Sequence, residues 1–469
     1  MKLKITGLIA LGCFLFAGLA SAREVTILVA GKKTPAYANA KKMADGKSIF
    51  AERKLHKAMT RIEEVIKAEE KCPMPRDIRL KWPKCNLSAD QRNLVINVKV
   101  AHGDYKGKGG RGNFGLQQVI APDATVRLLG GYDDNFKKRA PFDTPTTITL
   151  GGTIFKIMGK KHMLKEFYIS GFVMDIGDGN KYDAKTNCIL KGESATVQHI
   201  HLGYLNTRRL VYADNVFINS SHKAAAPLIR ARDGKAEVVI RNNFILNNIL
   251  AWEADSARFK TIPAVYTFEG NSFIMNWPYN PDPTTANPAA LQLGGKYAAS
   301  KFVVKSNLFA FNMGGAIYWT SPGEKMGPPT EIKNNLFFSN GALFGEAEPG
   351  AAAVVTKFGG FKSKDIPWNT ISVEILEDDY DWDSDGNVVM DPKVPITTIK
   401  AGFANSGSVR ANQTRMNDVR GMLGMNKQGG KVKISNYAPR MGVDLKVLPF
   451  PAEPKAKKYG VNRDRVEQF

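Results

Sequence analysis

Short runs of alternating apolar and polar residues recur along most of the chain. Ile96–Val100 alternates in this way, and residues 238–240 and 302–304 are further runs rich in β-branched residues. Alternation with a period of two is typical of a β-strand that buries one face. A turn follows the first run at His102-Gly103-Asp104. The pattern therefore predicts a chain made mostly of short strands.

One region near the amino terminus has a different period. Its apolar residues within 48–71 recur at steps of four, three and four, at Leu55, Met59, Ile62 and Ile66. This spacing places them on one face of an amphipathic helix. Such a helix needs a hydrophobic surface to cover, and we expect it to cap the β-structure that follows.

A motif that joins Asn to Phe recurs through the middle of the chain. The five copies are Asn215-Val216-Phe217, Asn242-Asn243-Phe244, Asn271-Ser272-Phe273, Asn307-Leu308-Phe309 and Asn335-Leu336-Phe337. In the last four copies another Asn stands three residues after the Phe, at Asn247, Asn276, Asn312 and Asn340. An earlier relative is Gly171-Phe172 with Asp175. The first Asn residues are 27, 29, 36 and 28 positions apart, a spacing that fits one coil of a three-sided β-helix with loop insertions.

This repeat predicts the fold class, an all-β right-handed parallel β-helix with an N-terminal capping helix. Coils stacked ~4.8 Å apart place equivalent side chains above one another, so Phe fills the interior and Asn hydrogen-bonds at a corner. Asn also tolerates the left-handed conformation of a tight corner. We expect an N-terminal segment with the capping helix over 23–92, the β-helix over 93–400 with on the order of eleven coils, and a C-terminal tail over 401–469. The tail should pack on the solenoid, with a polar end from Lys455 that is disordered.

The first residues have the pattern of a secretory leader. Lys2 and Lys4 precede the apolar run Ile5–Leu19, and Ala20-Ser21-Ala22 offers a small-residue cleavage site. The run is shorter than the roughly 20 residues that span a bilayer. We expect residues 1–22 to be a signal peptide, no transmembrane segment, and a secreted, periplasmic or cell-surface location.

The charge of the chain narrows the possible partners. It has 66 basic and 44 acidic residues, and the leader holds two of the basic ones, so 64 against 44 leave +20. Such an excess attracts polyanions. No nucleic-acid-binding motif accompanies it, so acidic polysaccharide or an anionic cell surface is the expected partner, and nucleic acid is not. A solvated basic surface is the plain alternative, and the oligomeric state is not readable.

Three cysteines follow the leader: Cys72, Cys85 and Cys188. In an oxidising compartment Cys72 and Cys85 are expected to form a disulfide that closes a loop of 12 residues. Cys188 is then left over as a buried, small apolar residue.

Several segments resemble the pectate-lyase-like superfamily of right-handed β-helices. They are Val98–Tyr105, Leu129-Gly130-Gly131-Tyr132 with Arg139, Pro141 and Phe142, Gly314–Tyr318, and Gly386-Asn387 with Asp391-Pro392. The resemblance covers about three quarters of the chain and implies the fold. It leaves function open, because this architecture carries lyases, epimerases, hydrolases and adhesins.

A basic face is expected on one side of the predicted coils. Alternation in 228–232 turns Arg230 and Arg232 outward, and the equivalent runs in later coils turn Gln292 and Tyr318 to the same face. Guanidinium groups beside a ring suit an acidic sugar, because Arg binds the anion and the ring packs on the pyranose. Arg208 and Arg209 extend the cluster, with Arg209, Gln292 and Tyr318 as expected substrate-binding residues. Ordinary solvated surface residues are the alternative.

The sequence around Arg232 is similar to chondroitinase B and related alginate lyases. That resemblance implies Arg232 as a catalytic residue and uronate β-elimination as the reaction. Arg230, beside it in the basic cluster, is expected to act with it. The chain departs from the family pattern at Asn206, where the family has a Lys base, and at Asp233, where it has His. Lys223 or Arg208 would then serve as the base. A lyase or epimerase is thus the alternative to a binding protein.

Two further patterns suggest metal or proton chemistry. Asp381, Asp383 and Asp385 with Gly386 form the DxDxDG start of a calcium loop, although Pro392 occupies the twelfth position, where a calcium loop carries Glu. His199 and His201 are spaced to lie on one face of a strand. Calcium is the one cofactor that the sequence suggests, and an acidic solvated loop is the alternative.

Overall fold

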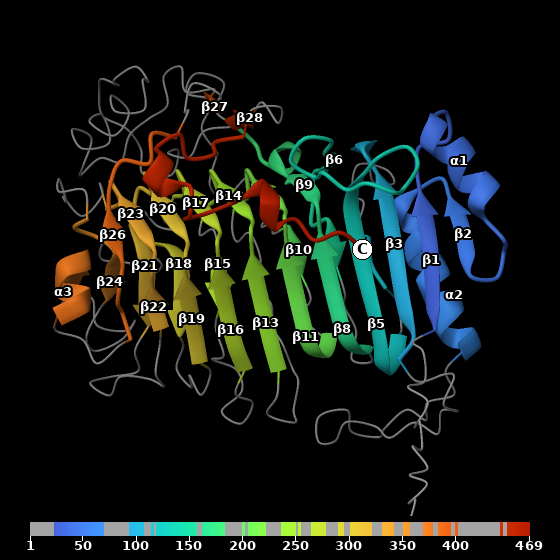
Figure 1. The fold of residues 1–469 in the computed structure, drawn as a ribbon, viewed down its shortest axis with the longest axis horizontal. Coiled ribbons are helices and arrows are strands. Elements are labelled where there is room, and N and C mark those ends of the chain that lie inside the picture. The colour runs from blue at the N-terminus through green and yellow to red at the C-terminus, as the bar shows by residue number, and fades with distance from the viewer. Residues whose placement is uncertain are drawn as a thin grey trace, which may run out of the picture.

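The computed structural model describes most of the strands and leaves parts of the connections aside. It covers residues 23–69, 93–106, 114–116, 119–156, 162–182, 199–201, 205–221, 236–249, 252–254, 264–277, 289–294, 301–320, 331–341, 350–356, 369–378, 383–394, 399–401, 441–443 and 448–469. The strands lie side by side along one rod, in nearly the order of the sequence (Figure 1).

Sheet A forms the longest side of the rod, and all its strand pairs are parallel. In spatial order its strands are β2 (Ile49–Glu52), β1 (Glu24–Val29), β3 (Val95–Ala101), β5 (Val119–Tyr132), β8 (His162–Ser170), β11 (Leu205–Ala213), β13 (Ala236–Arg241), β16 (Ala264–Glu269), β19 (Lys301–Lys305) and β22 (Glu331–Lys333).

Sheet B is the second side and is also parallel throughout. Its strands are β4 (Gly103–Tyr105), β6 (Thr146–Thr149), β9 (Phe172–Asp175), β12 (Val216–Ile218), β14 (Phe244–Leu246), β17 (Ser272–Ile274), β20 (Leu308–Ala310), β23 (Leu336–Phe338) and β26 (Val388–Val389).

Sheet C forms the third side. Its strands are β15 (Trp252–Ala254), β18 (Ala289–Gly294), β21 (Gly315–Thr320), β24 (Val354–Thr356) and β25 (Asn369–Ile371), the last of which pairs antiparallel. The smaller elements are the parallel pair β7 (Phe155–Lys156) and β10 (Ile200–His201), the antiparallel pair β27 (Ile399–Ala401) and β28 (Met441–Val443), and helix α3 (Val373–Asp378). The architecture is a parallel β-helix, as the repeat predicts.

Interior stacking follows the predicted physics. Phe273 is fully buried and its ring stacks on that of Phe309, with centroids 4.8 Å apart, while Phe309 stacks on Phe337 at 5.2 Å. Flat stacking is possible because the three residues occupy the same register position in adjacent strands of sheet B. The interior is thus a column of apolar side chains that each coil extends.

A ladder of Asn side chains holds the corner between sheets A and B. Asn307 shows the pattern: its Nδ2 donates to the carbonyl oxygen of Phe268 and to Oδ1 of Asn335, at 2.9 and 3.0 Å. The ladder members are Asn215, Asn243, Asn271, Asn307, Asn335 and Asn387. A second ladder after sheet B joins Asn248, Asn276, Asn312 and Asn340.

The register that the Asn-Phe repeat predicts is wrong by one residue in a single coil. The ladder uses Asn243 and Asn248, where the pattern indicated Asn242 and Asn247. Strand pairing consequently sets Ile245 opposite Phe273 and turns Phe244 outward. The interior accepts Ile in place of Phe, because both are apolar and fill the same column.

The ladder Asn was also expected to take the left-handed conformation of the corner, but another residue takes it. Positive φ belongs to the residue just before each ladder Asn, with Asn242 at 55°, Ser306 at 55° and Asn334 at 52°. Ser306 adopts this conformation although it lacks the special tolerance of Gly or Asn. We infer that the hydrogen bonds of the ladder impose the corner.

Two helices enclose the N-terminal end of the rod. Helix α2 (Leu55–Glu69) turns its apolar face, including Met59 and Ile62, into the core formed by inward residues of β1 and β3. This is the expected cap, but it begins at Leu55 because Ile49–Glu52 forms the edge strand β2. Helix α1 (Pro35–Met43) was not expected, and it packs Ala36 and Ala40 on the outward side of sheet A.

The end of the chain returns along the rod. Residues 448–469, here called the C-terminal strap, begin over the outer side of sheet B and end against the outward side of sheet A (Figure 1). They contain the short 3-10 turns Pro454–Ala456 and Arg463–Arg465. The N–H of Gly460 donates to the carbonyl oxygen of Ser306 at 2.8 Å, and Gln468 Nε2 donates to that of Arg139 at 2.9 Å. The expectation of a disordered end from Lys455 is therefore not met, because these polar residues bind the solenoid.

Among the described residues, no helix combines the length and apolar character needed to cross a membrane.

Candidate anion-binding site

Several residues of the expected basic face lie outside the part of the chain that the structure describes. They are the expected catalytic residues Lys223, Arg230 and Arg232. Uronate elimination therefore stays a prediction. Cys72 and Cys85 also lie outside the described residues, as do Cys188 and the leader 1–22, so the disulfide and the signal peptide stay predictions as well.

Arg209 is already engaged by carboxylates from neighbouring coils. Its Nη1 donates to Glu166 Oε2 at 2.6 Å, and its Nε lies 3.5 Å from Glu237 Oε2. Glu166 and Glu237 flank Arg209 in the register of sheet A. Arg208 stands beside it in β11 and is partly buried. The described part of the expected basic face is thus an ion-pair ladder that leaves little free charge.

Other charges on sheet A are paired in the same way. Lys301 pairs with Glu331, Lys305 with Glu269, and Lys333 with both Asp383 and Asp385. The hydrogen bond from Asp383 raises the pKa of Lys333 above its usual value. Lys333 therefore already pairs with the two described carboxylates of the expected calcium loop. The third, Asp381, lies outside the described residues. No group of three His, Cys, Asp or Glu side chains in the described residues is placed to hold a metal.

The expected sugar-binding pair is buried. Gln292 and Tyr318 do alternate with the interior residues Leu291 and Ile317, as predicted, but they are only 3% and 2% exposed. Burial raises the pKa of Tyr318 well above its usual value. The outward side of these strands is covered, so neither residue offers an open platform.

His199 lies in the interior and not on a free face. It is fully buried, its Nε2 lies 2.9 Å from the carbonyl oxygen of Ile218, and its ring packs edge-on against Phe217. A histidine held in this way supports the fold, and we assign it no metal role with His201.

The C-terminal strap covers much of the outer side of sheet B, from β9 to β23. Phe450 packs on Phe244 and Phe142 with ring centroids 5.0 and 5.9 Å away. Further along, Arg139 is fully buried beneath the strap, where it bonds Asp214 at 3.1 Å and the carbonyl oxygen of Glu467 at 2.8 Å. Arg139 therefore anchors the strap and is not available to a ligand.

The N-terminal cap has a large excess of unpaired positive charge. Residues 32–57 contain eight Lys or Arg residues and two acidic ones. The basic residues are Lys32, Lys33, Lys41, Lys42, Lys47, Arg53, Lys54 and Lys57, and all are exposed. No carboxylate of the described residues pairs with any of them under a 4.0 Å limit. We call these eight residues the basic cap.

The two acidic residues within 32–57, Asp45 and Glu52, bind groups other than the charged side-chain ends of the basic cap. Oδ1 of Asp45 accepts the N–H groups of Lys47, Ser48 and Ile49 at 2.7 to 2.8 Å, and Oδ2 accepts the Ser48 hydroxyl. These bonds, first that from the Ser48 hydroxyl, hold the pKa of Asp45 well below its usual value. Glu52 instead accepts a hydrogen bond from Arg61 at 3.2 Å.

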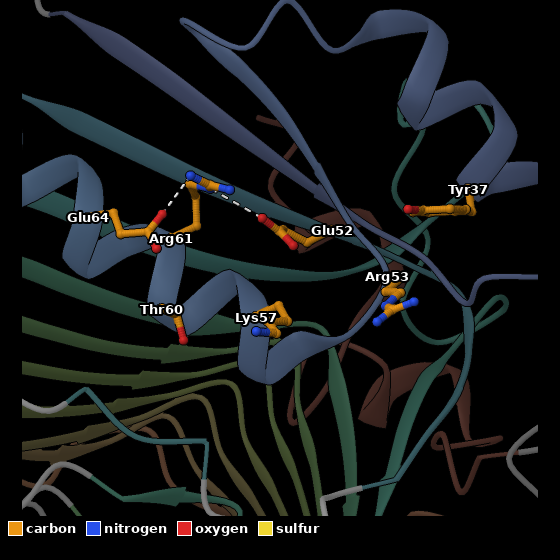
Figure 2. A pocket seen from close by; sticks show the side chains of 7 residues that line it. All are labelled: Tyr37, Glu52, Arg53, Lys57, Thr60, Arg61 and Glu64. Atoms are coloured by element: carbon orange, nitrogen blue, oxygen red, sulfur yellow. Dashed lines mark hydrogen bonds and ion pairs between the residues drawn. The ribbon is translucent and has the colours of Figure 1, made fainter.

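A pocket of about 350 Å³ opens in this cap, between Tyr37 on α1, the end of β2, and α2. Figure 2 shows its lining: Tyr37, Glu52, Arg53, Lys57, Thr60, Arg61 and Glu64. Arg61 is held by Glu52 and Glu64, and its guanidinium lies over the ring of Phe50, 4.9 Å from the centroid. Arg53 and Lys57 form no ion pair with the described residues, so the pocket has two cations free for an anion.

Sequence reasoning missed this site because it looked for charge at the stacked coils. The signal was present as a local imbalance, eight basic residues to two acidic ones within 26 positions, against 66 to 44 in the whole chain. The chain matches no protein-family model, no curated protein and no solved structure.

Proposed function

We propose that this protein binds acidic polysaccharide or an anionic cell surface through the basic cap at the N-terminal end of its β-helix. The observation that carries the proposal is the cluster of eight exposed cations, none of which forms an ion pair with a described carboxylate. On sheet A, in contrast, several described cations form ion pairs with Glu or Asp of a neighbouring coil.

Electrostatics favours a polymer over a small ion as the partner of such a surface. Exposed lysines attract each anion weakly, because water and salt screen single contacts. A polyanion meets many of them at once, and linked contacts raise the overall affinity. The predicted leader and the resemblance to the pectate-lyase-like superfamily support an acidic glycan outside the cytoplasm as that polymer.

Retention on immobilised polyanions tests the proposal. Wild type should bind alginate or heparin resin at low salt and elute as salt rises, because screening weakens surface charge contacts. Lys41→Ala with Lys42→Ala should elute at clearly lower salt. Lys455→Ala with Lys457→Ala removes the same charge from the exposed surface of the strap and should elute close to wild type.

Two outcomes would overturn the proposal. Wild type that passes through every polyanion resin at low salt would show that the cap has no such partner. Equal shifts for the cap and strap variants would show that net charge alone causes retention.

A further inference from the structure

We propose that the pocket between α1 and α2 binds one uronic acid residue of an acidic glycan, with Arg53 and Lys57 binding its carboxylate. This inference rests on the proposed function and adds a specific subsite to it. The pocket volume of about 350 Å³ lies at the lower end of the range for small-molecule sites, roughly 300–1,000 Å³. It therefore suits a single sugar ring better than a longer segment of chain.

The two free cations supply the recognition of the carboxylate. Arg53 can fork onto both oxygens of the anion, and Lys57 adds a second positive charge from the first turn of α2. That turn contains no acidic residue. Lys54, whose carbonyl oxygen accepts the N–H groups of Lys57 and Ala58, stands where helices usually have Ser, Thr, Asp or Asn. An anion bound here would relieve the repulsion between these cations.

The rest of the lining suits the hydroxyl groups of a sugar. Tyr37 and Thr60 contribute hydroxyls to the wall, and the Tyr37 hydroxyl forms no hydrogen bond with other described residues. Glu64 adds carboxylate oxygens that accept hydrogen bonds from sugar hydroxyls. Figure 2 shows Tyr37, Thr60 and Glu64 among the residues that line the pocket with Arg53 and Lys57.

The acidic residues of the pocket lining favour a uronate over a phosphate as the ligand. Glu52 and Glu64 line the pocket, and one cation, Arg61, is shared between them. Their remaining negative charge disfavours a dianion more than a monoanion. A free phosphate would moreover leave the hydroxyl-binding wall unused. The lining therefore favours a ligand with one negative charge and several hydroxyls.

Calorimetric titration of the whole protein with D-glucuronate tests the assignment, with D-glucose and inorganic phosphate as comparison ligands. Glucuronate should bind, while glucose and phosphate should bind at least tenfold more weakly. The double variant Arg53→Ala with Lys57→Ala should lose about tenfold or more in glucuronate affinity, because it removes charge-assisted hydrogen bonds. Tyr37→Phe should weaken glucuronate binding several-fold without any change in charge.

The matched control is Lys41→Ala with Lys42→Ala, which removes the same charge from the same cap outside the pocket lining. It should keep wild-type affinity for glucuronate while its retention on the polymer falls. Absence of glucuronate binding, equal affinity in the pocket variant, or equal binding of phosphate would each overturn the subsite. Retention on alginate could persist in all three cases, so the subsite can fail while the proposed function stands. Melting curves establish that each variant is folded.

Discussion

Removal of one Asn from the ladder between sheets A and B should destabilise the protein more than removal of an exposed Asn. Asn307→Ala deletes an amide whose Oδ1 accepts both the main-chain N–H and Nδ2 of Asn271, each at 2.9 Å. Its own Nδ2 donates to the carbonyl oxygen of Phe268 and to Asn335. The substitution therefore leaves the Asn271 main-chain N–H without its partner. It also takes one of two acceptors from Asn271 Nδ2, which keeps the carbonyl oxygen of Ile240 at 2.8 Å, and one donor from the Phe268 carbonyl oxygen.

The magnitude follows from the cost of leaving such groups without partners. A buried donor that loses its only partner costs about 1–3 kcal/mol. The lost bonds of Asn271 Nδ2 and of the Phe268 carbonyl oxygen add to this cost, so we expect a loss of about 2 kcal/mol or more. Asn335 Oδ1 is not counted, because it keeps the main-chain N–H of Asn307 at 3.0 Å. Asn135→Ala is the control, since Asn135 is exposed and accepts one hydrogen bond from Asn39. It should change stability by no more than about 0.5 kcal/mol.

Urea denaturation followed by tryptophan fluorescence measures both variants. Hydrogen exchange adds a local readout, because the Asn271 amide should lose protection in Asn307→Ala before the core strands do. If Asn307→Ala unfolds within about 1 kcal/mol of wild type, the ladder does not hold the corner and the reasoning is refuted.

Two further predictions concern the C-terminal strap. Phe244→Ala and Phe450→Ala should be coupled in a double-mutant cycle by about 0.5–1.5 kcal/mol, because their rings meet edge-on at 5.0 Å; additive losses would contradict this contact. At alkaline pH the strap should loosen, because burial raises the pKa of Tyr132 to about 12 and its hydroxyl donates to the Phe469 carbonyl oxygen at 3.3 Å. The neutral form stabilises the fold fully below the unfolded pKa of about 10, and this stability is lost as pH rises through the folded pKa. Melting curves from pH 9 to 12 should show a steeper decline for wild type than for Tyr132→Phe, and equal slopes would count against it.

The repeat made the fold predictable because stacked coils repeat the same chemistry. Every coil must fill one interior column and satisfy one corner, so Phe273 and Asn307 recur in sequence as they do in space. The one error arose where two Asn residues are adjacent, at 242–243 and 247–248. The sequence there is compatible with two registers, and only the pairing with the neighbouring strands selects Asn243.

The outward residues were harder to predict because their partners are distant in sequence. Arg209 meets Glu166 from the preceding coil, 43 residues earlier, and the length of each loop decides which residues meet. Burial of Gln292 and Tyr318 likewise depends on what covers sheet C, which the alternation of a strand does not encode. Alternation predicts the side of a strand correctly, but it does not predict whether that side is open.

The geometry of a solenoid explains why the cations of its N-terminal cap have no ionic partner among the described residues. Within the rod each outward residue has a neighbour about 4.8 Å above and another below, and opposite charges at these positions neutralise each other, as Glu166 and Arg209 do. The residues of the basic cap lie on α1, on loops and at the start of α2, outside the stacked coils. They therefore lack the lateral neighbours that would pair with them. A binding surface for polyanions can be built there without breaking any ladder that holds the coils together, and substitutions such as Lys41→Ala should change binding while leaving the fold intact.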